Sequence, residues 1–214
     1  MTIGIIGSGA LGSNLARALA QKGQSAIIAN RRGPQSLGDL VAELGSTITA
    51  GTVADAAAAD IVVLAMPWVA LEDALSGLPD WNGRIVIDGT NPVLFLDPDS
   101  PDAKDPANPL AAYGIKAVDI GDRHSSAIVA DLVPGARVVK AFNHLDVNVL
   151  PHPEAAGGQR VLFYSGDDAD AKARVRAILD AIGFLPIDLG TLDIGGPLAS
   201  LPFGPLATHN FVRI

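Results

Sequence analysis

The sequence predicts an α/β protein built on a doubly wound, mostly parallel sheet. Short apolar runs of strand length alternate with segments of helical period through most of the chain. A glycine-rich turn follows the first apolar run at once, as expected where a strand leads into a helix. The last part of the chain continues with strand, helix and strand, so we expect an extension of the same sheet and no all-helical second domain.

The glycine turn is the most informative stretch. Residues 2–6 form the first expected strand, and residues 7–12 follow with G-x-G-x-x-G spacing. Gly7 permits the tight turn, Gly9 lets the backbone approach a pyrophosphate, and Gly12 lets the helix pack on the strand. A helix over residues 11–22 and a strand over residues 25–29 complete the unit, which favours a Rossmann-type dinucleotide site over a plain glycine turn. The expected turn contacts are Gly7, Ser8, Gly9, Ala10, Leu11 and Gly12.

The end of the second strand indicates which dinucleotide binds. NAD sites usually have a carboxylate there, which accepts hydrogen bonds from the ribose 2′-hydroxyl. This chain has Asn30, Arg31 and Arg32 instead. Guanidinium groups match phosphate oxygens, and a neutral amide can still donate, so NADP is favoured over NAD. The alternative is that both arginines are ordinary solvated charges near the start of a helix.

Composition excludes several classes of function. The 214 residues are enough for one large α/β domain, and the net charge of -8 does not suit a general nucleic-acid binder. There is no cysteine, and the four histidines show no metal-ligand spacing, so no metal is expected. The longest apolar stretch, residues 61–71, is too short for a membrane span. We therefore expect a cytoplasmic protein without a membrane partner.

The remaining elements follow from periodicity and from stop signals. A domain over residues 1–145 and an extension over residues 146–214 are expected. Thr52 is the expected cap of one helix, with Asp55 at its third position, and Asp167 or Asp168 is the expected cap of the last. Helices are expected over residues 34–44, 52–59, 69–78, 125–132 and 168–182, and strands over residues 46–50, 61–65, 84–88, 117–120, 136–140, 159–165 and 185–189.

Ligands of such sheets bind outside the carboxyl ends of the strands. Besides the glycine turn, two loops are expected there, residues 66–68 (Met66, Pro67, Trp68) and residues 89–92 with Asn91. They are placed to hold the ribose and the nicotinamide. The alternative is that Met66 and Trp68 fill the core and that Asn91 belongs to a plain turn.

Two segments show no regular period. Residues 93–112 contain four prolines among several aspartates, and such a loop is either a functional lid or a solvated acidic segment. Residues 190–214 are rich in glycine and proline. This tail either closes a second-substrate site, wraps a partner subunit, or does neither.

Taken together, six segments resemble those of a known family: residues 5–12, 30–32, 63–68, 88–92, 139–143 (Val-Lys-Ala-Phe-Asn) and 165–168. The family is that of the NADPH-dependent oxidoreductases of coenzyme F-420, whose domain also forms the cytosolic part of six-transmembrane metalloreductases. The resemblance implies hydride transfer between NADPH and a deazaflavin (coenzyme F-420) or a flavin, a small-molecule redox partner, and a homodimer. It also implies that Ser8, Asn30 and both arginines hold phosphates, and that Asn143 borders the nicotinamide beside Met66 and Pro67.

Other readings of the chain stay open at this point. One is a reductase of a small carbonyl or imine compound, which would need a proton donor. His144 is the weak candidate, with Lys140 beside it, because each adjoins the end of the same strand. Another is an NADP-binding sensor without turnover.

Overall fold

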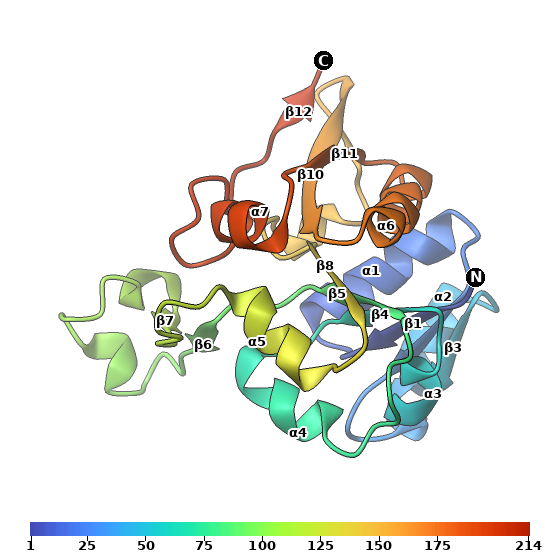
Figure 1. Ribbon diagram of the computed structural model, residues 1–214, viewed down its shortest axis with the longest axis horizontal. Coiled ribbons are helices and arrows are strands. Elements are labelled where there is room, and N and C mark those ends of the chain that lie inside the picture. The colour runs from blue at the N-terminus through green and yellow to red at the C-terminus, as the bar shows by residue number, and fades with distance from the viewer.

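Eight strands lie side by side in the central sheet, in the order β11-β10-β8-β5-β4-β1-β2-β3. The structure, a computed structural model shown in Figure 1, describes residues 1–214. The strands are β1 Ile3–Ile6, β2 Ala26–Ala29, β3 Ile48–Gly51, β4 Ile61–Leu64, β5 Ile85–Asp88, β8 Arg137–Ala141, β10 Gly158–Gly166 and β11 Leu185–Asp188. The helices are α1 Ala10–Gln21, α2 Gly38–Leu44, α3 Val53–Ala57, α4 Leu71–Leu75, α5 Ser125–Leu132, α6 Ala169–Ala181 and α7 Leu192–Ala199.

The first six strands of the sheet run parallel, from β3 across to β8. β10 pairs antiparallel with β8 and parallel with β11, so the part after residue 146 adds two strands of reversed direction to the same sheet. Two short strands, β9 Glu154–Ala155 and β12 Val212–Arg213, pair with the beginning of β10. The predicted mostly parallel, doubly wound sheet is confirmed.

Helices cover both faces of the sheet because the buried strands are apolar on both sides. In β4, Ile61 and Val63 belong to a core shared with α1 and α6. Val62 and Leu64 point the other way, into a core shared with α3, α4 and α5. Figure 1 shows these two helical layers on either side of the strands. The parallel strands therefore end together at one edge, where the loops after β1, β2, β4, β5 and β8 meet.

Local capping chemistry places several helices as expected. The side chain of Thr52 accepts from the backbone N–H of Asp55, whose carboxylate accepts from the Thr52 N–H, which completes a capping box at α3. Asp168 caps α6 by accepting from the Ala171 N–H at 2.7 Å. Asp167 instead accepts from the Leu192 N–H at 2.9 Å and ties the start of α7 to the end of β10.

Three expected helices are shorter than predicted, and the one expected over residues 52–59 ends at Ala57. The segment 34–44 begins as a 3-10 turn over Pro34–Leu37, and only Gly38–Leu44 is α-helical. The segment 69–78 likewise begins as a 3-10 turn, Trp68–Ala70, and α4 stops at Leu75 because Ser76 is extended. Apolar period alone does not distinguish a 3-10 turn from the first turn of an α-helix.

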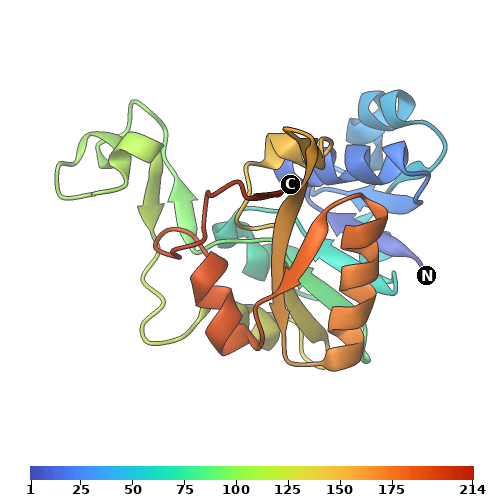
Figure 2. The same cartoon turned by 90° about the horizontal axis from the view of Figure 1, so that it is seen from above.

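The expectation of a structureless loop over residues 93–112 is wrong. β6 Val93–Phe95 pairs antiparallel with β7 Ile115–Ala117, and 3-10 turns lie between them. The expected strand over residues 117–120 is also wrong in its bounds, because β7 ends at Ala117 and shares only that residue with it. Figures 1 and 2 show this hairpin as an arm that stands away from the sheet. Three-residue strands show too little alternation to be recognised in the sequence.

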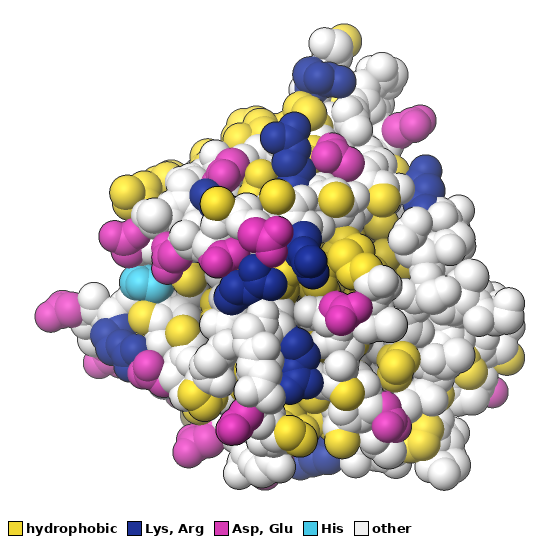
Figure 3. Space-filling model, turned by 45° about the vertical axis from the view of Figure 1, so that its right-hand side comes forward, with side chains coloured by type: hydrophobic (Ala, Val, Ile, Leu, Met, Phe, Trp, Pro, Cys, Tyr) yellow, Lys and Arg dark blue, Asp and Glu magenta, His cyan; other side chains and the backbone are white.

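The surface carries both signs of charge. On the face drawn in Figure 3, Lys and Arg side chains are interspersed with Asp and Glu. No helix has both the length and the apolar character needed to cross a membrane.

Candidate functional site

The glycine turn between β1 and α1 is shaped by its backbone. Gly7 has a φ of +116°, and a Cβ atom there would lie 2.1 Å from the carbonyl oxygen of Ala65. A Cβ atom on Gly12 would lie 1.9 Å from the carbonyl oxygen of Gly7. Both positions therefore require glycine. Gly9 differs, because a Cβ atom there would meet no protein atom within 4 Å, and the turn leaves open space on that side.

The N-terminus of α1 is suited to an anion. Gly9 is its N-cap, no side chain caps it, and its first turn contains no acidic residue. The first backbone N–H groups of a helix have no partner within the helix, and the helix dipole places partial positive charge at this end. The Ser13 hydroxyl donates to the Ser8 carbonyl at 3.0 Å and holds the turn against the helix. A phosphate group above Gly9 would meet these N–H groups.

The residues after β2 form a second polar group beside the turn. The Asn30 amide donates to the Ser8 hydroxyl at 2.8 Å and to the Ser36 hydroxyl at 3.0 Å, and its oxygen accepts from the Arg32 N–H at 2.9 Å. The side chains of Arg31 and Arg32 are exposed, and neither makes an ion pair within the chain. Arg31 lines the adjoining cavity, whereas Arg32 does not.

Two cavities run along the carboxyl edge of the sheet. The first, about 720 Å³, lies over the ends of β1 and β2 and is lined by Gly7, Asn30 and Arg31 among others. The second, about 400 Å³, lies over the ends of β4, β5 and β8. Met66 and Pro67 line both, so the two cavities form one cleft with the glycine turn at its centre. We call them the adenosine-side and the nicotinamide-side cavity, after the halves of NADP that the sequence predicts at these loops.

The structure brings most of the expected site residues to this cleft. Of the 14 expected cofactor contacts, Ser8, Gly12 and Arg32 line neither cavity, and Ser8 reaches the cleft only through Asn30. Those that line the nicotinamide-side cavity are Gly9, Ala10, Leu11, Met66, Pro67, Trp68, Asn91 and Asn143. Sequence reasoning missed two lining residues. Thr52 lines the adenosine-side cavity and follows β3 at the same edge of the sheet, and Leu201 of the tail lines the nicotinamide-side cavity.

The comparisons with known proteins agree with this geometry. The family model described as "NADP oxidoreductase coenzyme F420-dependent" matches residues 2–92. The crystal structure of a hypothetical protein, SMa0349 from Sinorhizobium meliloti, is 40% identical with a TM-score of 0.86, and the match covers 100% of this chain and 97% of that one. A proposed F420-dependent NADP reductase from Arthrobacter sp. is 26% identical with a TM-score of 0.67, over 90% of this chain and 86% of that one. The chain is therefore similar to NADP-dependent oxidoreductases, and its residues 2–92 match the model of this family.

A curated relative extends the similarity to a larger protein. The metalloreductase STEAP3 of Rattus norvegicus is 25% identical over 201 residues, which cover 94% of this chain. This chain spans 36% of the length of that relative.

In this oxidoreductase, two amides join the loops of the nicotinamide-side cavity. The Asn91 amide donates to the Asn143 carbonyl at 2.7 Å, and the Asn143 amide donates to the Asn91 side-chain oxygen at 3.1 Å. The Asn143 side-chain oxygen is buried and has no partner. Phe142, just before it, has a φ of +67°, a left-handed conformation that is strained for an aromatic residue. An unpaired buried acceptor beside a strained backbone is suited to a ligand that donates a hydrogen bond.

None of the 17 residues that line the nicotinamide-side cavity carries an ionisable side chain. His144 lines neither cavity. Its ring is buried under β10, where Nε2 accepts from the Phe163 N–H at 2.9 Å, and burial lowers the pKa of His144 to about 4. Lys140 is also buried, in an ion pair with Asp88 at 2.9 Å. The structure therefore brings neither candidate proton donor to the cleft.

Burial of His144 predicts a pH dependence of stability. The unfolded chain binds a proton at His144 below pH 6.5, whereas the folded chain binds it only near pH 4. Stability should therefore fall as the pH falls between these values, by about 3 kcal/mol at most. Urea unfolding at several pH values measures this slope. His144→Met should flatten the slope of unfolding free energy against pH between pH 5 and 6.5. An unchanged slope would show that His144 is not its cause.

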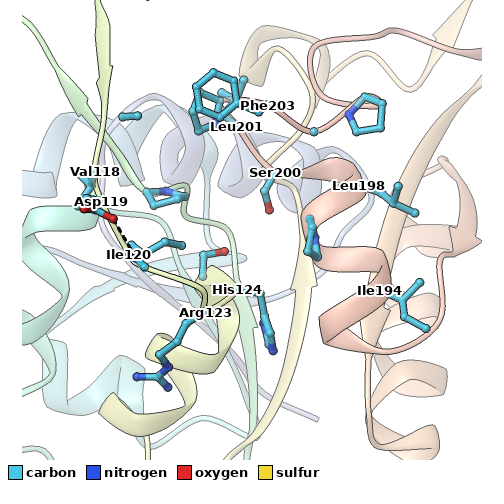
Figure 4. Close-up of a pocket in the computed structure, with 18 residues that line it drawn as sticks. Val118, Asp119, Ile120, Arg123, His124, Ile194, Leu198, Ser200, Leu201 and Phe203 are labelled. Atoms are coloured by element: carbon cyan, nitrogen blue, oxygen red, sulfur yellow. Dashed lines mark hydrogen bonds between the residues drawn. The ribbon is translucent and has the colours of Figure 1, made fainter.

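A third cavity, of about 710 Å³, lies between α7, the tail and the segment before α5. Figure 4 shows Ile194 and Leu198 on one side of it and Val118 and Asp119 on the other. Phe203 and Leu201 lie at the top of the view, and Arg123 and His124 lie at the bottom. Leu201 also lines the nicotinamide-side cavity, so the two spaces adjoin at this residue.

Proposed function

We propose that this oxidoreductase transfers a hydride between NADP(H) and a planar deazaflavin or flavin, such as coenzyme F-420, stacked against the nicotinamide. The observation that carries the proposal is the absence of any ionisable side chain among the residues of the nicotinamide-side cavity. A deazaflavin or flavin accepts a hydride directly, and this transfer needs proximity and orientation more than acid or base assistance. The apolar lining supports such a ligand, because it offers flat contact and excludes water.

The cleft fits NADP in three places. The open side of Gly9 and the N-terminus of α1 would receive the pyrophosphate. Arg31, which is exposed and without an ion pair, would bind the 2′-phosphate beside Asn30. The unpaired oxygen of Asn143 would accept from the carboxamide of the nicotinamide, while Met66, Pro67 and Trp68 would pack against the ring.

The name of the Arthrobacter relative supports coenzyme F-420 as the first acceptor to test. A carbonyl or imine reductase would require a proton donor near the nicotinamide. The polar side-chain groups that line this cavity are the hydroxyl of Thr90, the amides of Asn91 and Asn143 and the indole N–H of Trp68, all of which are poor acids. This favours the deazaflavin or flavin acceptor over the small carbonyl or imine compound.

The proposal is tested by anaerobic oxidation of NADPH with F-420, FMN, FAD, a quinone and a small imine, each added alone. We expect oxidation with F-420 or a flavin. Oxidation with the imine alone would replace the proposal with the reductase alternative. Measurable NADPH binding without turnover of any acceptor would favour a sensor.

The 2′-phosphate assignment predicts a selective loss of affinity. Arg31→Ala should weaken NADPH binding roughly ten- to a hundredfold, because a charge-assisted contact worth about 1.5 to 3 kcal/mol is lost. NADH binding should change little. Arg32→Ala is the matched control, since Arg32 is also exposed but lies outside the cavity. Titration by nucleotide fluorescence measures the affinity of each variant for NADPH and for NADH. Equal losses for the two nucleotides in Arg31→Ala would rule out the contact of Arg31 with the 2′-phosphate.

A further inference from the structure

An ion pair lies buried beneath the nicotinamide-side cavity. Lys140 of β8 and Asp88 of β5 face each other in register on neighbouring parallel strands, and their exposed fractions are 1% and 0%. The ammonium group of Lys140 donates to Asp88 Oδ2 at 2.9 Å, to the Thr90 carbonyl at 2.6 Å and to the Ser125 hydroxyl at 3.2 Å. All three N–H bonds of the ammonium group thus have partners.

The carboxylate of Asp88 is equally well satisfied. Its Oδ2 also accepts from the Ser126 hydroxyl at 2.8 Å, and its Oδ1 accepts from the Thr90 N–H at 3.0 Å and from the Thr90 hydroxyl at 2.7 Å. Buried ion pairs often add little to stability compared with apolar residues of similar volume, because both charges lose their hydration. We therefore explain this fully hydrogen-bonded buried network by the loop geometry that it fixes, and not by a gain in stability.

The network around the ion pair fixes the position of Thr90. The N–H, the hydroxyl and the carbonyl of Thr90 all bind to the ion pair, and Thr90 is only 3% exposed. The next residue, Asn91, is the point where three loops join. Its side-chain oxygen accepts from the Asn143 amide and from the Leu201 N–H at 2.9 Å. Asn91 therefore holds the Leu201 wall of the cavity and, together with the Ala199 carbonyl at 3.0 Å, the Asn143 amide.

We propose that Lys140 and Asp88 are positioning residues for the nicotinamide. They hold Thr90, which places Asn91, which in turn places the unpaired oxygen of Asn143 and the wall at Leu201. The proposal rests on the function proposed above, because it takes the nicotinamide to bind in this cavity. It also gives the tail a role, since its residue Leu201 closes one side of the site.

The test separates the two halves of the cleft with two ligands. Adenosine 2′,5′-bisphosphate probes only the adenosine side, whereas NADPH probes both, and its fluorescence reports the surroundings of the nicotinamide. The double variant K140M/D88N removes both charges together, so no unpaired charge remains buried. Asn91→Leu breaks the same chain of contacts without touching the ion pair. Asp168→Ala is the control for lost stability, because it uncaps α6 away from the cleft.

Both K140M/D88N and Asn91→Leu should weaken NADPH binding about tenfold or more, while bisphosphate affinity stays within about twofold. Both should also reduce the change in nicotinamide fluorescence on binding. The Asp168→Ala variant should lower the melting temperature and change neither affinity. If K140M/D88N keeps wild-type NADPH affinity and fluorescence, or weakens both ligands equally, the positioning role of the ion pair is wrong, whatever Asn91→Leu does. If the wild type binds the bisphosphate and NADPH equally well and without a fluorescence change, the proposed function fails first.

Discussion

Gly12→Ala is expected to destabilise the protein by about 3 kcal/mol, because the new methyl group overlaps the backbone of the glycine turn. The added Cβ atom would lie 1.9 Å from the Gly7 carbonyl oxygen and 2.9 Å from the Gly7 carbonyl carbon. These are backbone atoms, so α1 must move away from β1. Thermal unfolding followed by circular dichroism should show a fall in melting temperature of roughly 6 to 12 °C.

Gly9→Ala is the matched control for this prediction. Its Cβ atom would meet no protein atom, and its φ of −73° suits any residue, so stability should be unchanged. The methyl group would instead fill the space that we assign to the pyrophosphate, so NADPH affinity should fall about tenfold or more. A loss of stability in Gly9→Ala, or full NADPH affinity of this variant, would contradict the open pyrophosphate space at Gly9.

Asp88→Ala is expected to cost about 3 to 5 kcal/mol of unfolding free energy, because it leaves the charge of Lys140 buried without a partner. The variant also removes the acceptor of the Thr90 N–H and hydroxyl and of the Ser126 hydroxyl. Urea unfolding measures the loss. The double variant K140M/D88N should be clearly more stable than Asp88→Ala, since neither charge remains. A loss below about 1 kcal/mol for Asp88→Ala would mean that the pair is hydrated and not buried as described.

The features that sequence predicted best depend on short stretches of chain. The glycine turn is one, because the roles of Gly7 and Gly12 follow from the backbone within six residues of a strand end. The capping box of Thr52 and Asp55 is another, since both partners lie within one helical turn. The apolar run of β4 was recognised because a strand covered on both faces shows no polar residue.

The features that sequence missed depend on contacts between distant segments. Leu201 reaches the cleft through a hydrogen bond to Asn91, which lies 110 residues earlier. Lys140 looked like a candidate proton donor because its partner, Asp88, becomes its neighbour only when β5 and β8 pair in register. α7 was hidden by its glycines and by Pro197, although Gly195 is needed where the helix packs closely on Ser165 and Leu189.

Hydride transfer from NADPH to the deazaflavin is tested most directly by following the hydride itself. NADPH deuterated at the transferred position of the nicotinamide is mixed with the protein and oxidised F-420 under anaerobic conditions, and the reduced F-420 is analysed by mass spectrometry. We predict that the deuterium appears on the carbon of the deazaflavin ring and that NADPH oxidation shows an isotope effect. Reduced F-420 without deuterium, or no reduction of F-420 and of flavins while an imine or carbonyl compound takes up the label, would contradict hydride transfer between two stacked cofactors.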